Sequence, residues 1–473
     1  MKLFAKITKI FTLPVLIIIL IAGLLYSSIR SYTFQNKAAQ LLVERLSQDM
    51  QTAITIESVE VGWWKRMQLN HVLIRDQQGD TLIYAGKVNA KYSSFDKVNH
   101  IFSFKDLQLE DGKVHFEKLK GAKDPNYKFF IDYFKPKKKR DPNKPYITWI
   151  VKAEKVSIKN TQFRYHDYNY EQPDSRRFNE YFIEFNKIRG SLDTLTIIDD
   201  SLSFHVNSLF TQERSGLVAL GMKSDTKIHS KGLEFYNLLF STPYSILKGQ
   251  LVMSYSSFDD LEDFIDKVNI EGKLKESKVS IKDIAYFYED FWGESQIFYV
   301  SGNSSGPVKR LDITNLDVKY NKFTKLKGNI DFSGLPDINN TLIDANIKQF
   351  ETTTTEFTDL LGIDAVSASI ASLGKIAFNG SFIGFTHDFV SRGNGQTDLG
   401  NAFTDLKFNY ADQDVNSAKY KGKLSTLGFN LGPVLRTSTI GKFAGEINLD
   451  GTGLVLEKLD LKAKSDIKEI EIN

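Results

Sequence analysis

Two stretches of the chain, LQLEDGKVHF at residues 107–116 and VSIKNTQFRY at residues 156–165, share one pattern of apolar and polar residues. In both, apolar side chains alternate with polar ones before and after a short polar break, Asp111-Gly112 in the first and Asn160-Thr161 in the second. Alternation with a period of two is typical of a β-strand with one apolar face. The pair therefore predicts a repeated unit of strand, tight turn and strand in a mainly β protein.

The same period continues outward from these stretches. Residues 54–61 and 69–73 alternate in the same way, and the turn-forming sequence DQQGD at 76–80 precedes another strand-like run at 82–84. A second recurring phrase has glycines around alternating residues, at 328–334, 380–384 and 445–451, with Gly422 in a partial copy. Glycines that bound strands at such intervals predict tight turns or bulges in a regular, curved sheet.

The number of strands argues for one extended sheet. At roughly 15 residues per strand and turn, residues 51–473 would form about 28 strands, too many for one ordinary sandwich. No Pro-, Gly- or Ser-rich linker clearly divides the chain, so we expect an elongated, curled antiparallel β-sheet. Helical inserts are few: an amphipathic one at about 258–268, with an acidic outer face, and a short one at 355–363.

The N-terminus has the composition of a membrane anchor. Residues 10–29 carry no charge, and twenty helical residues span roughly 30 Å, the thickness of a bilayer core. The residues that we expect to hold this helix in the membrane are Ile10, Leu16, Ile19, Leu25 and Ile29.

The charges that flank the apolar segment predict its orientation. Lys2, Lys6 and Lys9 precede it with no acidic residue among them, which predicts a cytoplasmic tail at 1–9 and an extracytoplasmic remainder. A cleaved signal peptide is the alternative, but its apolar core is usually shorter, and no small-x-small cleavage site follows Gly23. We therefore expect a single-pass inner-membrane protein.

Two further segments are predicted from composition. Residues 30–50 indicate an amphipathic helix that caps the following strands, with an apolar stripe of Phe34, Ala38, Leu41, Leu42 and Leu46. Residues 135–145 are rich in Lys and Pro and predict a solvated, mobile loop. The alternative for this loop is contact with anionic lipid headgroups through Lys137, Lys138, Lys139 and Arg140.

The composition argues against most kinds of chemistry. The 61 basic and 58 acidic residues leave a formal net charge of +3, too small for a nucleic-acid partner to be expected, and the absence of cysteine excludes disulfides and thiolate sites. The seven histidines are not paired at metal-binding spacings, and the acidic run at 259–263 lacks the glycine and distal glutamate of an EF-hand. The glycines at 302–306 and 393–395 have no phosphate-binding lysine in register. We expect no catalytic residues, no cofactor and no metal.

Taken in order, these pieces resemble the TamB proteins of the AsmA-like group, whose architecture is related to the repeating β-groove lipid transfer proteins. The resemblance rests on the anchor, the helix at 34–50, the phrases ITIESVEVGWW at 54–64 and LNHVLIRD at 69–76, and the glycine-bounded strands including 380–388. The phrasing and the abundance of Lys, Asn, Ile and Phe resemble the Bacteroidota branch. Family members are usually longer, so the chain is either a fragment or lacks the part that would meet the outer membrane.

The resemblance implies a periplasmic groove with an apolar concave face. Phospholipid acyl chains would slide along it from the inner membrane toward the outer membrane, where a TamA-like insertase is the implied partner. The alternative function is a translocation and assembly factor for outer-membrane β-barrel proteins. The alternative structure is a closed core, in which alternating residues pack against a second sheet; the residues concerned are Ile158, Phe163, Phe332, Phe382, Phe429 and Leu449. The sequence does not assign faces, because a register error of one residue turns every side chain over.

Overall fold

The computed structural model describes residues 32–62, 66–134, 148–173, 176–257, 260, 263–360, 371–409, 417–452 and 460–472. These residues are mainly β, with 22 strands and a few helices. They form two compact units, unit 1 (Met1–Lys267 with Lys282–Gly293) and unit 2 (Val268–Ile281 with Glu294–Asn473). Many strands are longer than the sequence estimate assumed, up to 18 residues, which accounts for part of the difference from the expected number.

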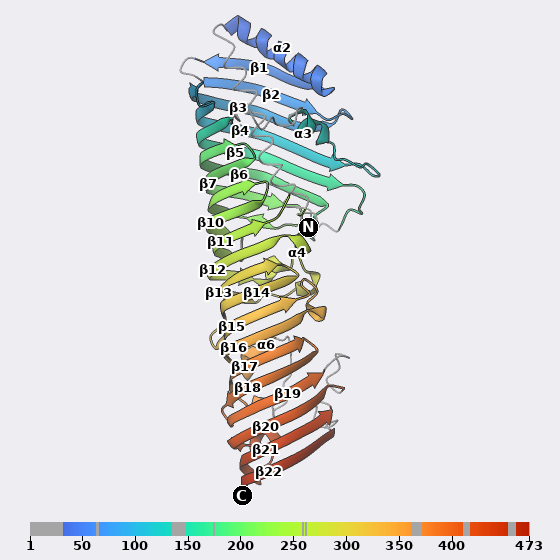
Figure 1. The fold of residues 1–473 in the computed structure, drawn as a ribbon, viewed down its shortest axis with the longest axis vertical. Helices are drawn as coiled ribbons and strands as arrows, with labels where there is room; N and C mark the ends of the chain where they lie inside the picture. The colour runs from blue at the N-terminus through green and yellow to red at the C-terminus, as the bar shows by residue number, and fades with distance from the viewer. Residues whose placement is uncertain are drawn as a thin grey trace, which may run out of the picture. The chain divides into compact units, whose positions relative to one another are not determined.

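Unit 1 is a sheet edged by the helix α2 (Tyr32–Met50) (Figure 1). Its strands are β1 (Ile54–Gly62), β2 (Arg66–Arg75), β3 (Thr81–Asp96), β4 (Ile101–Lys118), β5 (Ile150–Asp167), β6 (Phe182–Ile198), β7 (Ser201–Glu213), β8 (Val218–Ala219), β9 (Gly221–His229), β10 (Gly232–Ser241) and β11 (Ile246–Ser254). Each strand from β1 to β7 pairs with the next, β7 pairs with both β8 and β9, and β9 to β11 follow in order. The predicted turn at 76–80 does separate β2 from β3.

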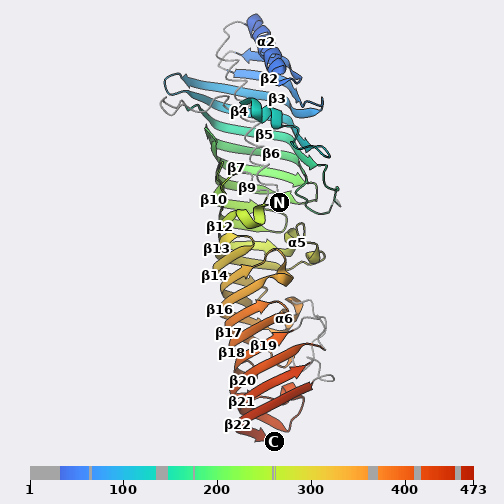
Figure 2. The same ribbon diagram turned by 45° about the vertical axis from the view of Figure 1, so that its right-hand side comes forward.

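Unit 2 is a meander in which every strand pairs antiparallel with the next (Figure 2). Its strands are β12 (Asn269–Ser280), β13 (Ile297–Pro307), β14 (Arg310–Tyr320), β15 (Thr324–Ser333), β16 (Leu342–Thr353), β17 (Lys375–Phe385), β18 (Asp388–Thr397), β19 (Gly400–Asn409), β20 (Lys419–Asn430), β21 (Ile440–Thr452) and β22 (Asp460–Ile472).

The two similar stretches lie side by side, in a way that the sequence did not indicate. β4 and β5 are parallel, and the pairing sets Leu107 opposite Val156 and Val114 opposite Phe163. The expectation of a wholly antiparallel sheet was therefore wrong at this pair. The crossover that a parallel pair requires is the connection 119–149, which contains α3 (Lys128–Phe134).

The predicted tight turns inside these stretches are kinks within continuous strands. Asp111 and Asn160 have φ of 54° and 46°, and the Asn160 side-chain amide donates a hydrogen bond to the Asp111 carboxylate. Asn and Asp tolerate the left-handed region better than most residues. One extra residue at each kink keeps Ile158 and Phe163 on the same face, although they are five positions apart.

Gly334 directly follows β15, as predicted, but most of the recurring glycines lie inside strands instead of bounding them. Gly380 is in the middle of β17 with φ of 159°, and a Cβ there would lie 2.2 Å from the Arg392 carbonyl oxygen on β18. Gly422 on β20 approaches the Asp405 carbonyl of β19 in the same way, with a Cβ placed 2.1 Å from it. These glycines permit a backbone approach that no other residue allows.

The helices match the predictions in part. A helix at 30–50 is confirmed as α2, but the predicted stripe is wrong at Leu41, which is 65% exposed, because the helix turns Val43 and Met50 toward the sheet. α6 (Thr354–Leu360) confirms the short helix near 355, whereas the insert at 258–268 is reduced to the four residues of α4 (Phe264–Lys267), with 258–259 and 261–262 outside the described residues. The remaining short elements are α5 (Ile281–Ile284), η2 (Glu289–Phe291), η3 (Ile338–Asn340) and α8 (Gly432–Leu435).

The predicted anchor at 10–29, with its flanking tail, lies outside the described residues. Among the helices that are described, none has the length and apolar character needed to cross a bilayer.

Candidate functional site

The strand register of unit 1 places apolar side chains in rows that cross the sheet. One row, all buried, consists of Ile54, Ile74, Ile83, Val114 and Phe163. A second row consists of Val59, Leu69, Val88, Leu109 and Ile158. The row next to the second one, displaced by one residue along each strand, is wholly polar. It consists of Glu60, Gln68, Asn89, Gln108 and Ser157. The sheet of unit 1 therefore has one apolar and one polar face.

Unit 2 repeats this arrangement over eight strands, β15 to β22. Four neighbouring rows on one face contain no charged residue. The first of these rows is Phe332, Ile343, Gly384, Phe389, Phe408, Tyr420, Gly451 and Leu461, and the second is Ile330, Ala345, Phe382, Ser391, Leu406, Gly422, Leu449 and Ala463. We call this surface the apolar face of unit 2. Aromatic rings contact one another across its strands, with centroids 4.6 Å apart for Phe382 and Phe389 and 5.2 Å apart for Phe389 and Phe408.

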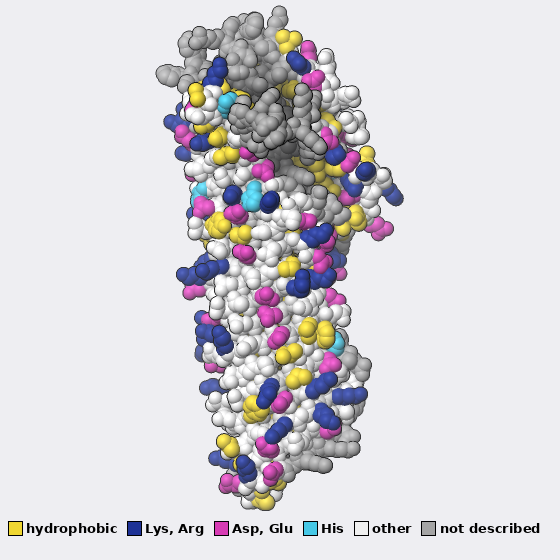
Figure 3. Space-filling model, viewed as in Figure 1, with side chains coloured by type: hydrophobic (Ala, Val, Ile, Leu, Met, Phe, Trp, Pro, Cys, Tyr) yellow, Lys and Arg dark blue, Asp and Glu magenta, His cyan; other side chains and the backbone are white. Residues whose placement is uncertain are grey.

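The opposite face of unit 2 carries ion pairs between adjacent strands. Arg392 lies 3.8 Å from Asp405, Lys421 3.0 Å from Asp450 and Lys407 3.9 Å from Asp388. Figure 3 shows side chains of both signs interspersed over this unit. Exposed pairs of this kind contribute little to stability, but they mark the side of the sheet that faces water.

The apolar face of unit 2 is less covered than that of unit 1. Side chains in the core of a sandwich are buried by the opposing sheet, whereas Ile330, Phe382 and Phe408 are only half-buried. Among the described residues of unit 2, the apolar side chains that are fully buried are Val268, Leu316, Tyr320, Ala345, Ala418 and Phe443. The alternative structure, in which this face packs against a second sheet as a closed core, is therefore not the packing that the described part of unit 2 shows.

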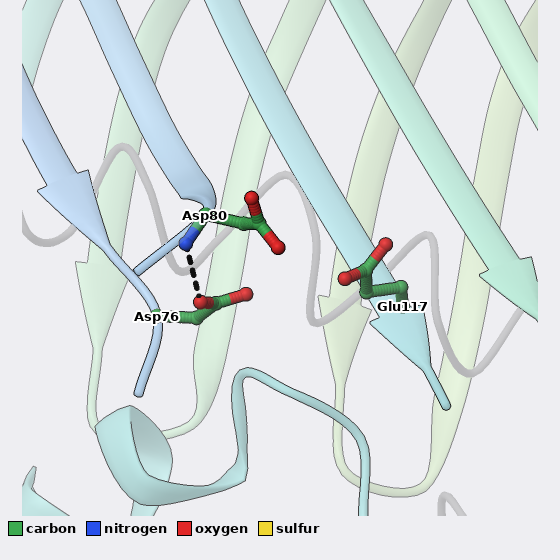
Figure 4. A group of neighbouring side chains, drawn as sticks. All are labelled: Asp76, Asp80 and Glu117. Atoms are coloured by element: carbon green, nitrogen blue, oxygen red, sulfur yellow. Dashed lines mark hydrogen bonds between the residues drawn. The ribbon is translucent and has the colours of Figure 1, made fainter. Parts of the chain in front are cut away.

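Three carboxylates meet in unit 1, at Asp76, Asp80 and Glu117 (Figure 4). Each offers an oxygen within 4.8 Å of the others, a spacing that a hard cation can bridge. However, Asp76 Oδ1 accepts hydrogen bonds from the backbone N–H groups of Gln78 and Asp80, and its Oδ2 accepts one from the side-chain amide of Asn126. These bonds fix the β2–β3 turn and attach the Asn126 loop to it, so the cluster has a structural role.

A polar cluster next to these carboxylates joins β4, β5 and β6 on the polar face of unit 1. His166 Nε2 lies 2.9 Å from Glu184 Oε1, and Arg164 lies 3.9 Å from Glu117. Burial, aided by the positive charge of Arg164, lowers the pKa of His115 to about 4. Burial raises the pKa of Glu117, against the attraction of Arg164. The sequence did not indicate this cluster because its members are far apart along the chain.

The site residues predicted from the sequence fall outside the described residues. These are the anchor positions in 10–29 and the basic positions Lys137, Lys138, Lys139 and Arg140. The alternating residues are placed on the apolar faces, Ile158 and Phe163 in unit 1 and Phe332, Phe382 and Leu449 in unit 2. The alternation in the sequence indicated that these residues share an apolar face, but only the strand register shows which face each one occupies.

No family model, no curated protein and no solved structure matches the chain.

Proposed function

We propose that this protein is anchored in the inner membrane by one helix, with its N-terminus cytoplasmic and its bulk periplasmic, and that it carries phospholipids passively toward the outer membrane. The apolar face would form the floor of a curled, groove-like sheet, as in the TamB-type family that the sequence resembles. The observation that supports it is the set of four uncharged rows in unit 2, which run across eight strands and whose large apolar side chains are half-buried at the positions where exposure is described.

The absence of charge in these rows is what hydrocarbon requires of a surface. An acyl chain gives a charged group no solvation, so one buried charge in the floor would oppose the passage of lipid. Polar residues within the rows, such as Ser391 and Thr404, are small and neutral. Glycines occupy the positions in the rows where neighbouring strands approach most closely, and they add no side chain to the face. A face of this size left to water would be a liability in a soluble protein.

The alternative role in assembly of outer-membrane proteins would use a different surface. A client strand pairs with an exposed sheet edge; each strand from β13 to β21 is paired on both sides, and in the described part of the chain β22 is paired with β21 alone, so such an edge is confined to one strand, whereas the uncharged rows cross eight. The exposed apolar face therefore favours lipid over a client strand. A TamA-like insertase at the outer membrane remains part of the proposal as a partner.

Photo-crosslinking in the full chain tests the proposal. A benzophenone amino acid is placed at Phe382 or Phe389, and at the neighbouring apolar residues Ile383 or Val390 of the opposite face as matched controls, which are 49% and 41% exposed. After irradiation in cells, mass spectrometry of the purified protein detects covalent phospholipid. We expect adducts at Phe382 and Phe389 only. Equal labelling of both faces, or no lipid at either, would overturn the proposal.

A further inference from the structure

A cluster of exposed aromatic side chains lies at one edge of unit 1, where β3 ends and where β4 and β5 begin. Phe95 and Phe102 stack with ring centroids 4.5 Å apart, and Trp149 stacks on Phe102 at 5.6 Å. Trp149 is 51% exposed, Phe95 37% and Val98, in the β3–β4 turn, 84%. We call Phe95, Val98, Phe102 and Trp149 the aromatic rim.

The aromatic rim is the outer end of the apolar face of unit 1. Phe95 pairs with Phe102, and the same row continues through Val151, Ile197 and Leu202. Val151 and Ile197 are 6% exposed, so the row passes from buried to exposed at the strand ends. This end of the sheet therefore presents apolar rings to water beside the polar residues of the β3–β4 turn.

The turn that carries Val98 is held in shape by its own side chains. The Asp96 carboxylate accepts hydrogen bonds from the backbone N–H groups of Val98 and Asn99 and from the Asn99 side-chain amide. Lys97 is exposed beside Val98. Aromatic and cationic side chains together are the composition that settles at the boundary between lipid headgroups and acyl chains.

The N-terminal end of α2 lies at this same edge of unit 1. Ser47, near the end of α2, shares hydrogen bonds with the backbone of Ile54 at the start of β1, and α2 lies along β1 (Figure 1). A helix of 19 residues is about 28 Å long and a strand of 9 residues about 30 Å. Tyr32 therefore lies near Gly62, at the far end of β1, and the chain that precedes Tyr32 carries the apolar segment 10–29.

The aromatic rim lies at the same edge of the sheet and extends farther out. Gly62 pairs with Arg66, and Arg66 with Lys91, whereas Phe95 is four residues further along β3, or about 13 Å. Figure 2 shows the end of the β3–β4 hairpin projecting from the side of unit 1. The sequence between Gly62 and Arg66 is Trp-Trp-Lys.

We propose that the aromatic rim docks on the surface of the lipid bilayer that holds the anchor and is the point at which lipid enters the protein. This inference rests on the proposed function and adds the loading point. The aromatic rings would lie at the headgroup boundary, Lys97 would face the phosphates, and the exposed rings of Phe95 and Trp149 would meet the acyl chains first.

The absence of cysteine allows a direct test of docking, because one Val98→Cys substitution gives a single labelling site in the full chain. The matched control is Gln78→Cys, an exposed residue in the β2–β3 turn at the opposite edge of the same sheet. Both proteins, labelled with an NBD fluorophore, are reconstituted into vesicles of phosphatidylethanolamine and phosphatidylglycerol. We expect spin-labelled lipid to quench the fluorophore at residue 98 and aqueous iodide to quench it at residue 78. Quenching of residue 98 by iodide but not by lipid, or its protection from both quenchers by a second copy of the chain, would overturn the proposal.

A second measurement tests loading separately from docking. The double substitution Phe95→Ser with Trp149→Ser is combined with the photo-crosslinker at Phe389, and Tyr299→Ser, 53% exposed on β13, is the control. We expect the rim variant to lower the yield of lipid adduct several-fold while its circular dichroism melting curve is unchanged. An unchanged adduct yield would refute loading at the rim while leaving the proposed function intact. No adduct in any of the proteins, the unsubstituted rim included, would instead refute the proposed function.

Discussion

Units 1 and 2 are built on the same strand pattern, but their apolar faces differ in coverage. In unit 1, Ile74, Ile83 and Phe163 are 1%, 4% and 2% exposed, and the segment around α3 packs on this face, with the Tyr127 ring 4.3 Å from that of Phe116. In unit 2, the equivalent rows are half-buried, and several positions are glycines. Alternation along the strands therefore makes a sheet two-faced, but it does not determine whether the apolar face becomes a buried core.

The largest difference should appear when a large side chain is removed from each face. We expect Phe163→Ala to lower the free energy of opening of β4–β6 by about 3–5 kcal/mol, because it leaves a cavity in a packed interior. Phe382→Ala should cost only about 1–2 kcal/mol in β16–β18, since its side chain is only half-buried. Hydrogen exchange of the strand amides measures both values. Similar losses at the two positions would show that the face of unit 2 is a closed core.

Glycines in unit 2 should affect stability by permitting close approach of the backbones, not by burying apolar surface. We expect Gly380→Ala to destabilise β17 and β18 by about 1–3 kcal/mol, because its Cβ would lie 2.2 Å from the Arg392 carbonyl oxygen. The control is Gly395→Ala on β18, where the nearest atom lies 3.5 Å away and the expected change is within about 0.5 kcal/mol. Exchange rates of the β17–β18 amides distinguish the two variants. Equal effects would mean that the close strand approach is not needed.

Acid should weaken unit 1 more than unit 2. The pKa of His115 is lowered to about 4 by burial and by Arg164, whereas a histidine in an unfolded chain titrates near about 6.5. Between these values only the unfolded chain takes up the proton, so stability is lost as the pH falls from about 6.5 to about 4.

We expect this loss to be on the order of 1–2 kcal/mol, because His115 keeps some contact with water. His115→Gln should remove it, and His205→Gln keeps the number of histidines equal as a control. The measurement is hydrogen exchange of β4–β6 and of β15–β18 at several pH values. A pH dependence that persists unchanged in His115→Gln would contradict the assignment.

The smallest effect is expected on the polar face of unit 2. Arg392→Gln breaks the exposed pair with Asp405 and should change the stability of β18 and β19 by no more than about 0.5 kcal/mol. The same exchange experiment measures it. A loss of several times this size would show that the charged face packs against something, which would weaken the contrast between the two faces.

Part of the architecture could be predicted from the sequence because it depends on local periodicity. The stretches at 107–116 and 156–165 indicated strands with one apolar face, and residues 30–50 indicated a helix; both are present. The parallel pairing of β4 and β5 could not be predicted, since parallel and antiparallel strands share the same alternation. The kinks at Asp111 and Asn160 were interpreted as turns because the same residue types favour both.

The candidate site divides in the same way. The sequence by itself determined that one side of each strand is apolar and the other polar, because side chains alternate along an extended backbone. Only the tertiary structure decided which residues share a row, that the rows of unit 2 contain no charge, and that this face is less covered than that of unit 1. Register and coverage are set by pairing and packing between segments far apart in the chain, so neither is encoded in any single stretch.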